Sequence, residues 1–349
     1  MNRRIVAVFV SVAFTVPHAG AQTAAPGSRE VPAHTVPVPD TVSPQMRAIV
    51  GAPINANWRI FPKSAEEWKA QVKVAAANAV QTLPALREYL HVKVEARKID
   101  GVNAFVVTPE EIPPANRNRL LIHVHGGCYV NNPGEAATVE AIFMAGFGHF
   151  RVISVDYRMP PDAPYPAALD DAMTVWKAAL KMAAPTNMAI FGSSAGGALT
   201  LSMVLRAKIE NLPLPGAIAP GTPMADLTET GDSFLTNAFL DNVLVAPGTG
   251  CDARARLYAN GRDLKDPLLS PIYGDMSGFP PAILTTGTRD LLLSNTVRVH
   301  RKLRQAGVEA VLQVYEGLAH AQYFRDAAAP ESRETFEEIA RFFDIHLGK

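Results

Sequence analysis

Short, continuously apolar segments recur in the chain from residue 120 onward, and longer stretches of helical character separate them. They lie at residues 120–124, 152–155, 188–191, 217–219 and 282–286, and a last strand is expected at 310–315. Strands that are apolar on both sides of the pleat are typical of a parallel sheet with helices packed on both faces. The alternation therefore predicts an α/β fold built around a mostly parallel central sheet.

Two segments upstream of these strands alternate between apolar and polar residues. They lie at residues 91–96 and 102–107, and the turn pair Asp100-Gly101 separates them. This pattern is typical of a β-hairpin. We expect an antiparallel hairpin at the N-terminal side of the sheet, and an amphipathic helix near the C-terminus, from about residue 331 to residue 346.

Two segments outside the strand pattern predict a helical cap. Residues 44–90 have a helical pattern that includes Trp58, Phe61 and Trp68, and residues 226–266 contain no clear strand. We interpret residues 91–349 as the core domain, with the second segment inserted into it and the first packed beside that insertion. For residues 44–90 a plain structural role at the start of the domain is the alternative, because position in the sequence does not separate the two.

The first residues resemble a secretory signal peptide. Met1-Asn2-Arg3-Arg4 is followed by an apolar stretch and by Ala19-Gly20-Ala21, which together match the three parts of such a leader. We predict a signal peptide at residues 1–21, a Pro-rich linker at residues 22–43, and a protein that is exported to the periplasm or secreted. The apolar stretch is shorter than the roughly 20 residues that span a bilayer, so we expect no stable membrane anchor after cleavage.

Charge and cysteine content narrow the expected partners. The chain has 33 basic and 33 acidic residues, so it offers no electrostatic reason to expect nucleic acid or an anionic membrane as a partner. A small-molecule substrate is expected instead. Cys128 and Cys251 are the only cysteines; an oxidising compartment would allow them to pair, and the sequence leaves this open, as it leaves open whether the protein is a homodimer. We predict no metal and no cofactor.

One motif predicts a nucleophile. The apolar strand at residues 188–191 runs into Gly192-Ser193-Ser194-Ala195-Gly196, and a helix of small residues follows. Gly-x-Ser-x-Gly in this context is typical of a nucleophile elbow, whose glycines let the strand and the helix approach closely. We expect Ser194 to be the nucleophile; Ser193 lacks the symmetric glycine spacing. The alternative is a glycine-rich turn that only connects two elements.

A second glycine motif predicts an oxyanion hole. The strand at residues 120–124 ends in His125-Gly126-Gly127-Cys128, upstream of the predicted elbow. Backbone N–H groups in such a loop, together with the N–H of the residue after the nucleophile, bind the negative oxygen of a tetrahedral intermediate. We expect Gly127, Cys128 and Ala195 to be these donors. A plain Gly-Gly turn is the alternative.

An acid and a base follow the nucleophile motif in the chain order that is typical of folds with a nucleophile elbow. Asp290 comes just after the strand at residues 282–286, and His320 follows the last strand. Ligands of open α/β sheets bind beyond the carboxyl ends of the strands, and a serine needs a base that a carboxylate orients. We predict His320 as the base and Asp290 as the acid. Glu316 is the second choice of acid, and helix capping is the alternative role for Asp290.

These motifs together resemble the hormone-sensitive-lipase family of bacterial esterases, which has the α/β-hydrolase fold. The likeness rests on His-Gly-Gly-x-Tyr, on residues 155–161 and on Gly-x-Ser-Ala-Gly-Gly, and it extends from about residue 90 to the end. Two positions depart from the family's usual pattern. Cys128 stands where a third glycine is usual, and a positive φ there would cost about 1–2 kcal/mol. Ser193 stands where the family commonly has Asp.

The resemblance and the motifs predict a serine carboxylesterase that acts on short- to medium-chain esters through an acyl-enzyme. A lactonase or a deacetylase would use the same triad and is an alternative within the same chemistry. A hydrolase-like binding protein without turnover is an alternative from another class. Such proteins usually lack one triad member, whereas candidates for all three are present here.

Overall fold

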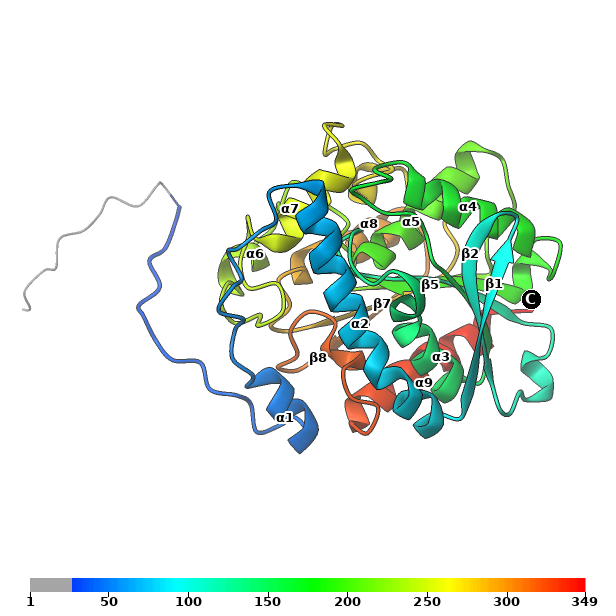
Figure 1. The fold of residues 1–349 in the computed structure, drawn as a ribbon, viewed down its shortest axis with the longest axis horizontal. Coiled ribbons are helices and arrows are strands. Elements are labelled where there is room, and N and C mark those ends of the chain that lie inside the picture. The colour runs from blue at the N-terminus through cyan, green and yellow to red at the C-terminus, as the bar shows by residue number, and fades with distance from the viewer. Residues whose placement is uncertain (1–26, 349) are drawn as a thin grey trace, which may run out of the picture. The chain divides into compact units, whose positions relative to one another are not determined.

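The computed structural model describes residues 27–348 (Figure 1). The chain divides into two units, Met1–Pro37 and Val38–Lys349. In the first unit, residues 27–37 form neither helix nor strand. The predicted signal peptide, residues 1–21, and the first part of the predicted linker lie outside the described residues. The rest of that linker is free of helix and strand up to residue 43.

The second unit is built on an eight-stranded sheet with the order β1-β2-β4-β3-β5-β6-β7-β8. Strands β1 and β2 form an antiparallel hairpin, β2 pairs antiparallel with β4, and all other neighbours are parallel. The predicted fold class is thereby confirmed. The strands are β1 (Val92–Ile99), β2 (Val102–Pro109), β3 (Leu120–Val124), β4 (Arg151–Val155), β5 (Met188–Ser193), β6 (Ala217–Gly221), β7 (Ala282–Gly287) and β8 (Ala310–Tyr315).

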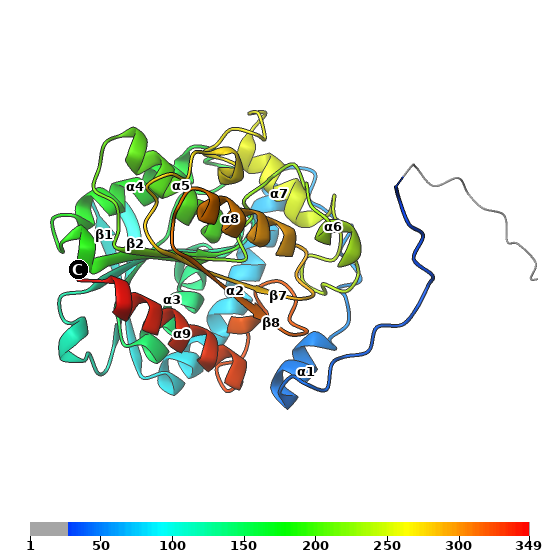
Figure 2. The ribbon, with the colours of Figure 1, turned by 180° about the vertical axis from the view of Figure 1, so that it is seen from behind.

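Helices cover both faces of the sheet, as Figures 1 and 2 show from opposite sides. Helices α3 (Val139–Gly148) and α9 (Pro330–His346) pack on one face. Helices α4 (Ala167–Ala179), α5 (Ala195–Ile209) and α8 (Leu293–Gln305) pack on the other. Because both faces are covered, the central strands are buried along their length, which explains why they read as continuous apolar runs.

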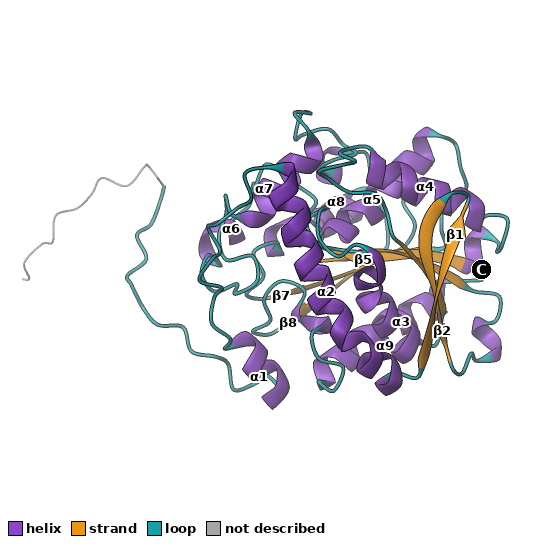
Figure 3. Ribbon diagram, in the orientation of Figure 1, coloured by secondary structure: helices purple, strands orange, loops and turns teal. Residues whose placement is uncertain are grey.

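Four more helices come from the segments assigned to the cap (Figure 3). They are α1 (Pro44–Val50), α2 (Ala65–Tyr89), α6 (Ser233–Thr236) and α7 (Gly250–Ala259). Helix α2 begins at the capping residue Ser64, whose hydroxyl accepts a hydrogen bond from the Glu67 N–H at 3.2 Å, and it buries Trp68 and Leu83. Such a cap contributes about 1 kcal/mol to the start of a helix.

Five 3₁₀ turns connect these elements: Pro114–Asn116, Gly134–Thr138, Pro185–Asn187, Pro271–Tyr273 and Gln322–Phe324. None of the helices within residues 27–348 combines the length and the apolar character that crossing a membrane requires.

Candidate active site

Ser194 lies at the sharp turn between β5 and α5. Its backbone has φ 63° and ψ −122°, a conformation that costs an L-residue about 1–3 kcal/mol and persists only where the surroundings impose it. A Cβ at Gly192 or Gly196 would come within 2.0 Å of the Val124 carbonyl oxygen. The two glycines are therefore required for β3, β5 and α5 to meet, and this meeting holds Ser194 in its strained turn.

His320 and Asp290 meet beyond the carboxyl ends of β8 and β7. His320 Nδ1 lies 3.1 Å from Asp290 Oδ1, and both side chains are buried. The same Oδ1 accepts a hydrogen bond from the Leu292 N–H at 2.8 Å, just ahead of α8. Asp290 thus contacts both the imidazole and the turn before α8. The N-cap of α8 is Leu292 and has no side-chain cap, so Asp290 does not have the alternative role of helix cap.

The second oxygen of Asp290 is held by two threonines. Thr286 Oγ1 donates to Oδ2 at 3.0 Å, and the Thr222 hydroxyl, which follows β6, donates to the same oxygen. Thr222 Oγ1 also lies 3.2 Å from His320 Nδ1. These contacts fix the carboxylate plane and stabilise its charge.

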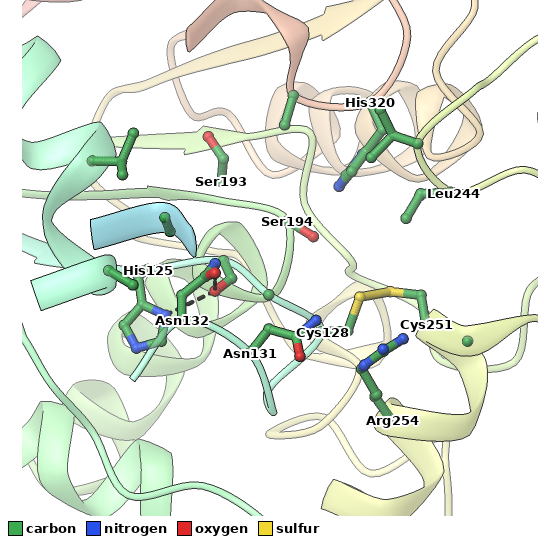
Figure 4. Close-up of a pocket in the computed structure, with 18 of the residues that line it drawn as sticks. His125, Cys128, Asn131, Asn132, Ser193, Ser194, Leu244, Cys251, Arg254 and His320 are labelled. Atoms are coloured by element: carbon green, nitrogen blue, oxygen red, sulfur yellow. Dashed lines mark hydrogen bonds between the residues drawn. A yellow bond between two sulfur atoms is a disulfide. The ribbon is translucent and has the colours of Figure 1, made fainter. Parts of the chain in front are cut away.

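Ser194 and His320 line one cavity of about 410 Å³. Figure 4 shows the Ser194 hydroxyl and the His320 ring facing each other. The cavity wall includes Gly127 and Cys128 from the loop after β3, and the segment before α2 contributes Trp58 and Phe61. The structure thus brings the predicted nucleophile, base and loop donors to one place.

The loop after β3 is braced from several sides. The Gly126 carbonyl accepts hydrogen bonds from His125 Nδ1 at 2.7 Å and from Asn132 Nδ2 at 3.2 Å. The His125 ring stacks on Tyr157 at 4.0 Å between centroids, and the Tyr157 hydroxyl donates to the His125 carbonyl at 2.6 Å. Burial lowers the pKa of His125 to about 3, so the ring is neutral and donates through Nδ1.

Two consecutive residues of the loop after β3 have positive φ angles. Gly127 has φ 117° and Cys128 has φ 53°, and both residues line the cavity. Ala195, the first residue of α5, has no intrahelical acceptor for its N–H, as is general at a helix start. The positive φ at Cys128 meets the condition stated above, so this position carries a strain of about 1–2 kcal/mol that glycine would avoid.

A disulfide between Cys128 and Cys251 connects this loop to α7. The two Cα atoms are 5.4 Å apart, and Cys251 is the second residue of the helix. The question that the sequence left open is settled in favour of pairing. The bond ties the predicted oxyanion loop to the segment at residues 226–266.

Ser193 has a carboxylate partner from another element. Its hydroxyl donates to Glu140 Oε1 at 2.6 Å and its N–H to Glu140 Oε2 at 3.0 Å, and the Tyr323 hydroxyl lies 2.6 Å from Ser193 Oγ. His123 Nε2 contacts the same carboxylate at 3.3 Å. Glu140, on α3, therefore supplies the polar anchor behind the elbow that an Asp at position 193 would otherwise give.

Asp241 is a second buried carboxylate beside the Asp290 loop. Its Oδ2 accepts the Leu291 N–H at 2.8 Å, and its Oδ1 accepts the N–H groups of Val243 and Leu244. Burial, and next the charge of Asp290, raise the pKa of Asp241. The residue fixes the chain after Asp290 and so helps to position it.

Four residues that sequence reasoning did not identify belong to this region: Thr222, Glu140, Asp241 and Arg254. Each is distant in the sequence from the predicted site residues that it lies near, and none is part of a recognisable motif. Thr222 alone carried a signal, because it follows a predicted strand at the carboxyl edge where Asp290 and His320 also lie. Within residues 27–348 no group of three or more His, Cys, Asp or Glu side chains is placed to hold a metal ion.

The disulfide leads to a prediction about stability. It closes a separation of 123 residues, so Cys251→Ser is expected to lower the free energy of unfolding by about 2–5 kcal/mol. The double variant Cys128→Gly, Cys251→Ser is expected to regain about 1 kcal/mol, because glycine adopts the positive φ without strain. Denaturant unfolding of the three proteins measures both effects. An unfolding midpoint of Cys251→Ser equal to the parent's would contradict the first.

Known proteins resemble this chain over most of its length. The alpha/beta hydrolase fold family matches residues 121–324. An esterase from Acinetobacter venetianus is 30% identical over 240 residues, which cover 68% of this chain and 78% of the relative. An acetyl-hydrolase from Streptomyces hygroscopicus is 27% identical and is covered to 84%, with 72% of this chain aligned.

Solved structures resemble the fold of this chain. The crystal structure of an esterase, E25, superposes with a TM-score of 0.88 at 45% identity, covering 92% of this chain and 99% of that one. A hormone-sensitive lipase from a metagenome library superposes with a TM-score of 0.69 at 25% identity, covering 80% and 98% of the two chains.

Proposed function

The chain belongs to the α/β-hydrolase fold family and is a hydrolase of carboxylic esters, and we propose that Ser194, His320 and Asp290 form its catalytic triad. The observation that carries the proposal is the strained Ser194 in the same cavity as His320, whose ring contacts the buried Asp290. The resemblance to hormone-sensitive-lipase esterases that the motifs indicated is confirmed.

In the proposed mechanism Ser194 Oγ attacks the ester carbonyl while His320 Nε2 accepts the hydroxyl proton. The N–H groups of Gly127, Cys128 and Ala195 stabilise the oxyanion. His320 then gives the proton to the leaving alcohol, and a water molecule repeats both steps on the acyl-enzyme. Throughout, the Asp290 charge stabilises the imidazolium ring and holds it in place.

The cavity supports a small ester as substrate. Its volume of about 410 Å³ falls within the range of small-molecule sites, about 300–1,000 Å³. Trp58, Phe61 and Leu244 give it apolar walls. We propose acyl chains of short to medium length, and p-nitrophenyl esters from acetate to decanoate would locate the optimum. A deacetylase remains the second candidate, because two of the relatives are named acetyl-hydrolases.

Labelling with a fluorophosphonate tests the assignment of the nucleophile. We expect the parent protein to gain one label, which mass spectrometry of the digest places on Ser194. Ser194→Ala is expected to remain unlabelled. Ser193→Ala serves as the matched control, because it removes the neighbouring hydroxyl but keeps Ser194 at the elbow. A label on Ser193, or an unlabelled parent, would refute the proposal.

We also propose that the protein is exported, as the sequence predicts. The disulfide between Cys128 and Cys251 supports this, because such bonds persist in oxidising compartments outside the cytosol. N-terminal sequencing of the mature protein is expected to begin at residue 22, after cleavage of residues 1–21.

A further inference from the structure

Arg254 is a cation of the active-site cavity that has no acidic partner among the described residues. It lies on α7, and Figure 4 shows its side chain beside the disulfide. Its Nε is buried without a hydrogen-bond partner, and within the described part of the chain it forms no ion pair. Burial lowers the pKa of Arg254, yet an arginine keeps its charge in proteins. A guanidinium in this situation is incompletely satisfied.

The contact of Arg254 with the Trp68 ring leaves its hydrogen-bonding donors free. The guanidinium carbon lies 5.2 Å from the centroid of the Trp68 ring, a contact of the cation–π type. A ring face attracts the charge but offers no acceptor for the N–H fork, which matches the two oxygens of a carboxylate. Packing on Trp68 therefore explains where the Arg254 side chain lies, but it leaves the guanidinium N–H groups without an acceptor.

The other charged groups that line the cavity do not pair with Arg254. Besides Arg254 the lining contains Arg325 and Glu140. The Glu140 carboxylate is bound by Ser193 and His123, and Arg325 already experiences the negative charge of Asp241. The lining thus carries more positive than negative charge, and within residues 27–348 neither arginine forms an ion pair. Burial lowers the pKa of both, and only for Arg325 does a carboxylate, Asp241, act against this.

The disulfide fixes the position of the helix that carries Arg254. Cys251 and Arg254 are three residues apart on α7 and so lie on the same side of the helix. Cys251 is bonded to Cys128 in the loop that we propose to hold the oxyanion. Arg254 therefore has a set position relative to the reacting carbonyl, which a residue that selects substrates requires.

We infer that Arg254 determines specificity by binding a carboxylate of the substrate, so that the preferred esters are those that carry a free carboxylate beside the scissile bond. The inference rests on the proposed function and names a substrate class for the same site. A site built around a partly buried, unpaired charge favours the ligand that pairs with it and discriminates against an uncharged isostere.

Matched pairs of substrates test this inference. Monoethyl adipate is compared with its carbamoyl isostere, in which an amide replaces the free carboxylate on the acyl side. Likewise 4-acetoxybenzoate is compared with 4-acetoxybenzamide, which places the same change on the alcohol side. Proton release gives kcat/KM for each. In at least one pair we expect the parent to favour the acid by about 10-fold or more, the gain typical of a charge-assisted hydrogen bond.

Variants show whether Arg254 causes the preference. In Arg254→Met the ratio of kcat/KM for acid over amide is expected to fall at least 10-fold, mainly through KM of the acid. Because the ratio is taken within one protein, a loss of folded material cancels. Arg256→Met is the matched control: it removes the same charge from the same helix, but Arg256 is exposed and paired with Asp252 at 2.9 Å, so the ratio is expected to stay at the parental value.

The outcomes separate the inference from the proposed function. The inference is overturned if the parent hydrolyses the two uncharged amide isosteres as well as the two acids. It is also overturned if the ratio of kcat/KM for acid over amide in Arg254→Met equals the parental ratio. Either result leaves the proposed esterase function unaffected. A parent that hydrolyses none of the four esters and takes no fluorophosphonate label overturns the proposed function, and the inference with it.

Discussion

Ser194→Ala is expected to lower kcat on p-nitrophenyl butyrate by about 10⁵- to 10⁶-fold, and His320→Ala by a similar factor, with KM little changed. The two groups act in one proton transfer, since the hydroxyl is a poor nucleophile until the imidazole accepts its proton. The double variant is therefore expected to be no slower than either single variant. Steady-state kinetics of the three proteins, with circular dichroism to confirm folding, measure this.

The comparison of the double variant with the two single variants is the decisive feature of this experiment. If the serine and the histidine acted in separate steps, their effects would multiply, and the double variant would fall below detection. Multiplying losses, or a Ser194→Ala protein that keeps more than about 1% of parental kcat, would contradict a shared role. The Ser193→Ala protein controls for disturbance of the turn, because it alters the buried contact with Glu140 but keeps the nucleophile.

The sheet could be predicted from the sequence because strands that are buried on both faces consist of consecutive apolar residues. Strands β3, β5, β6 and β7 read as apolar runs close to their observed bounds. The positions of Asp290 and His320 followed from the same pattern, since parallel strands end at one edge of a sheet. That the loops after β7 and β8 bring them to 3.1 Å agrees with this reasoning.

Other features depend on contacts between distant parts of the chain and left no local signal. Cys128 was recognised as a departure from glycine, but its positive φ and its bond to Cys251 emerge only when α7 is placed against the loop after β3. Ser193 departs from the Asp that the family resemblance implies, and the carboxylate that contacts it, Glu140, comes from the distant helix α3. Arg254 is one of several arginines in its segment, and only the cavity distinguishes it from Arg256.

Asp290→Asn is expected to lower kcat by about 10³- to 10⁴-fold, the range typical for a triad carboxylate. The contacts of Asp290 decide how this variant fails. Oδ1 faces two donors, the Leu292 N–H and His320 Nδ1, so the amide oxygen of Asn is expected to occupy this position and to keep the ring oriented. The amide N–H₂ group then faces the hydroxyls of Thr222 and Thr286, which can accept from it. What Asn removes is the charge that stabilises the imidazolium.

Asp290→Ala separates orientation from charge, because it removes both. Without an acceptor at Oδ1 the ring of His320 loses its fixed tautomer, and kcat is expected to fall about 10-fold further than in Asp290→Asn. Glu316→Gln is the matched control: it is the same chemical change at the exposed second candidate acid, and parental kinetics are expected. If Glu316→Gln were the slow variant and Asp290→Asn retained more than about 10% of parental kcat, the acid of the triad would be Glu316. Equal losses in Asp290→Asn and Asp290→Ala would instead mean that the negative charge, and not the orientation of the ring, accounts for the whole contribution of Asp290.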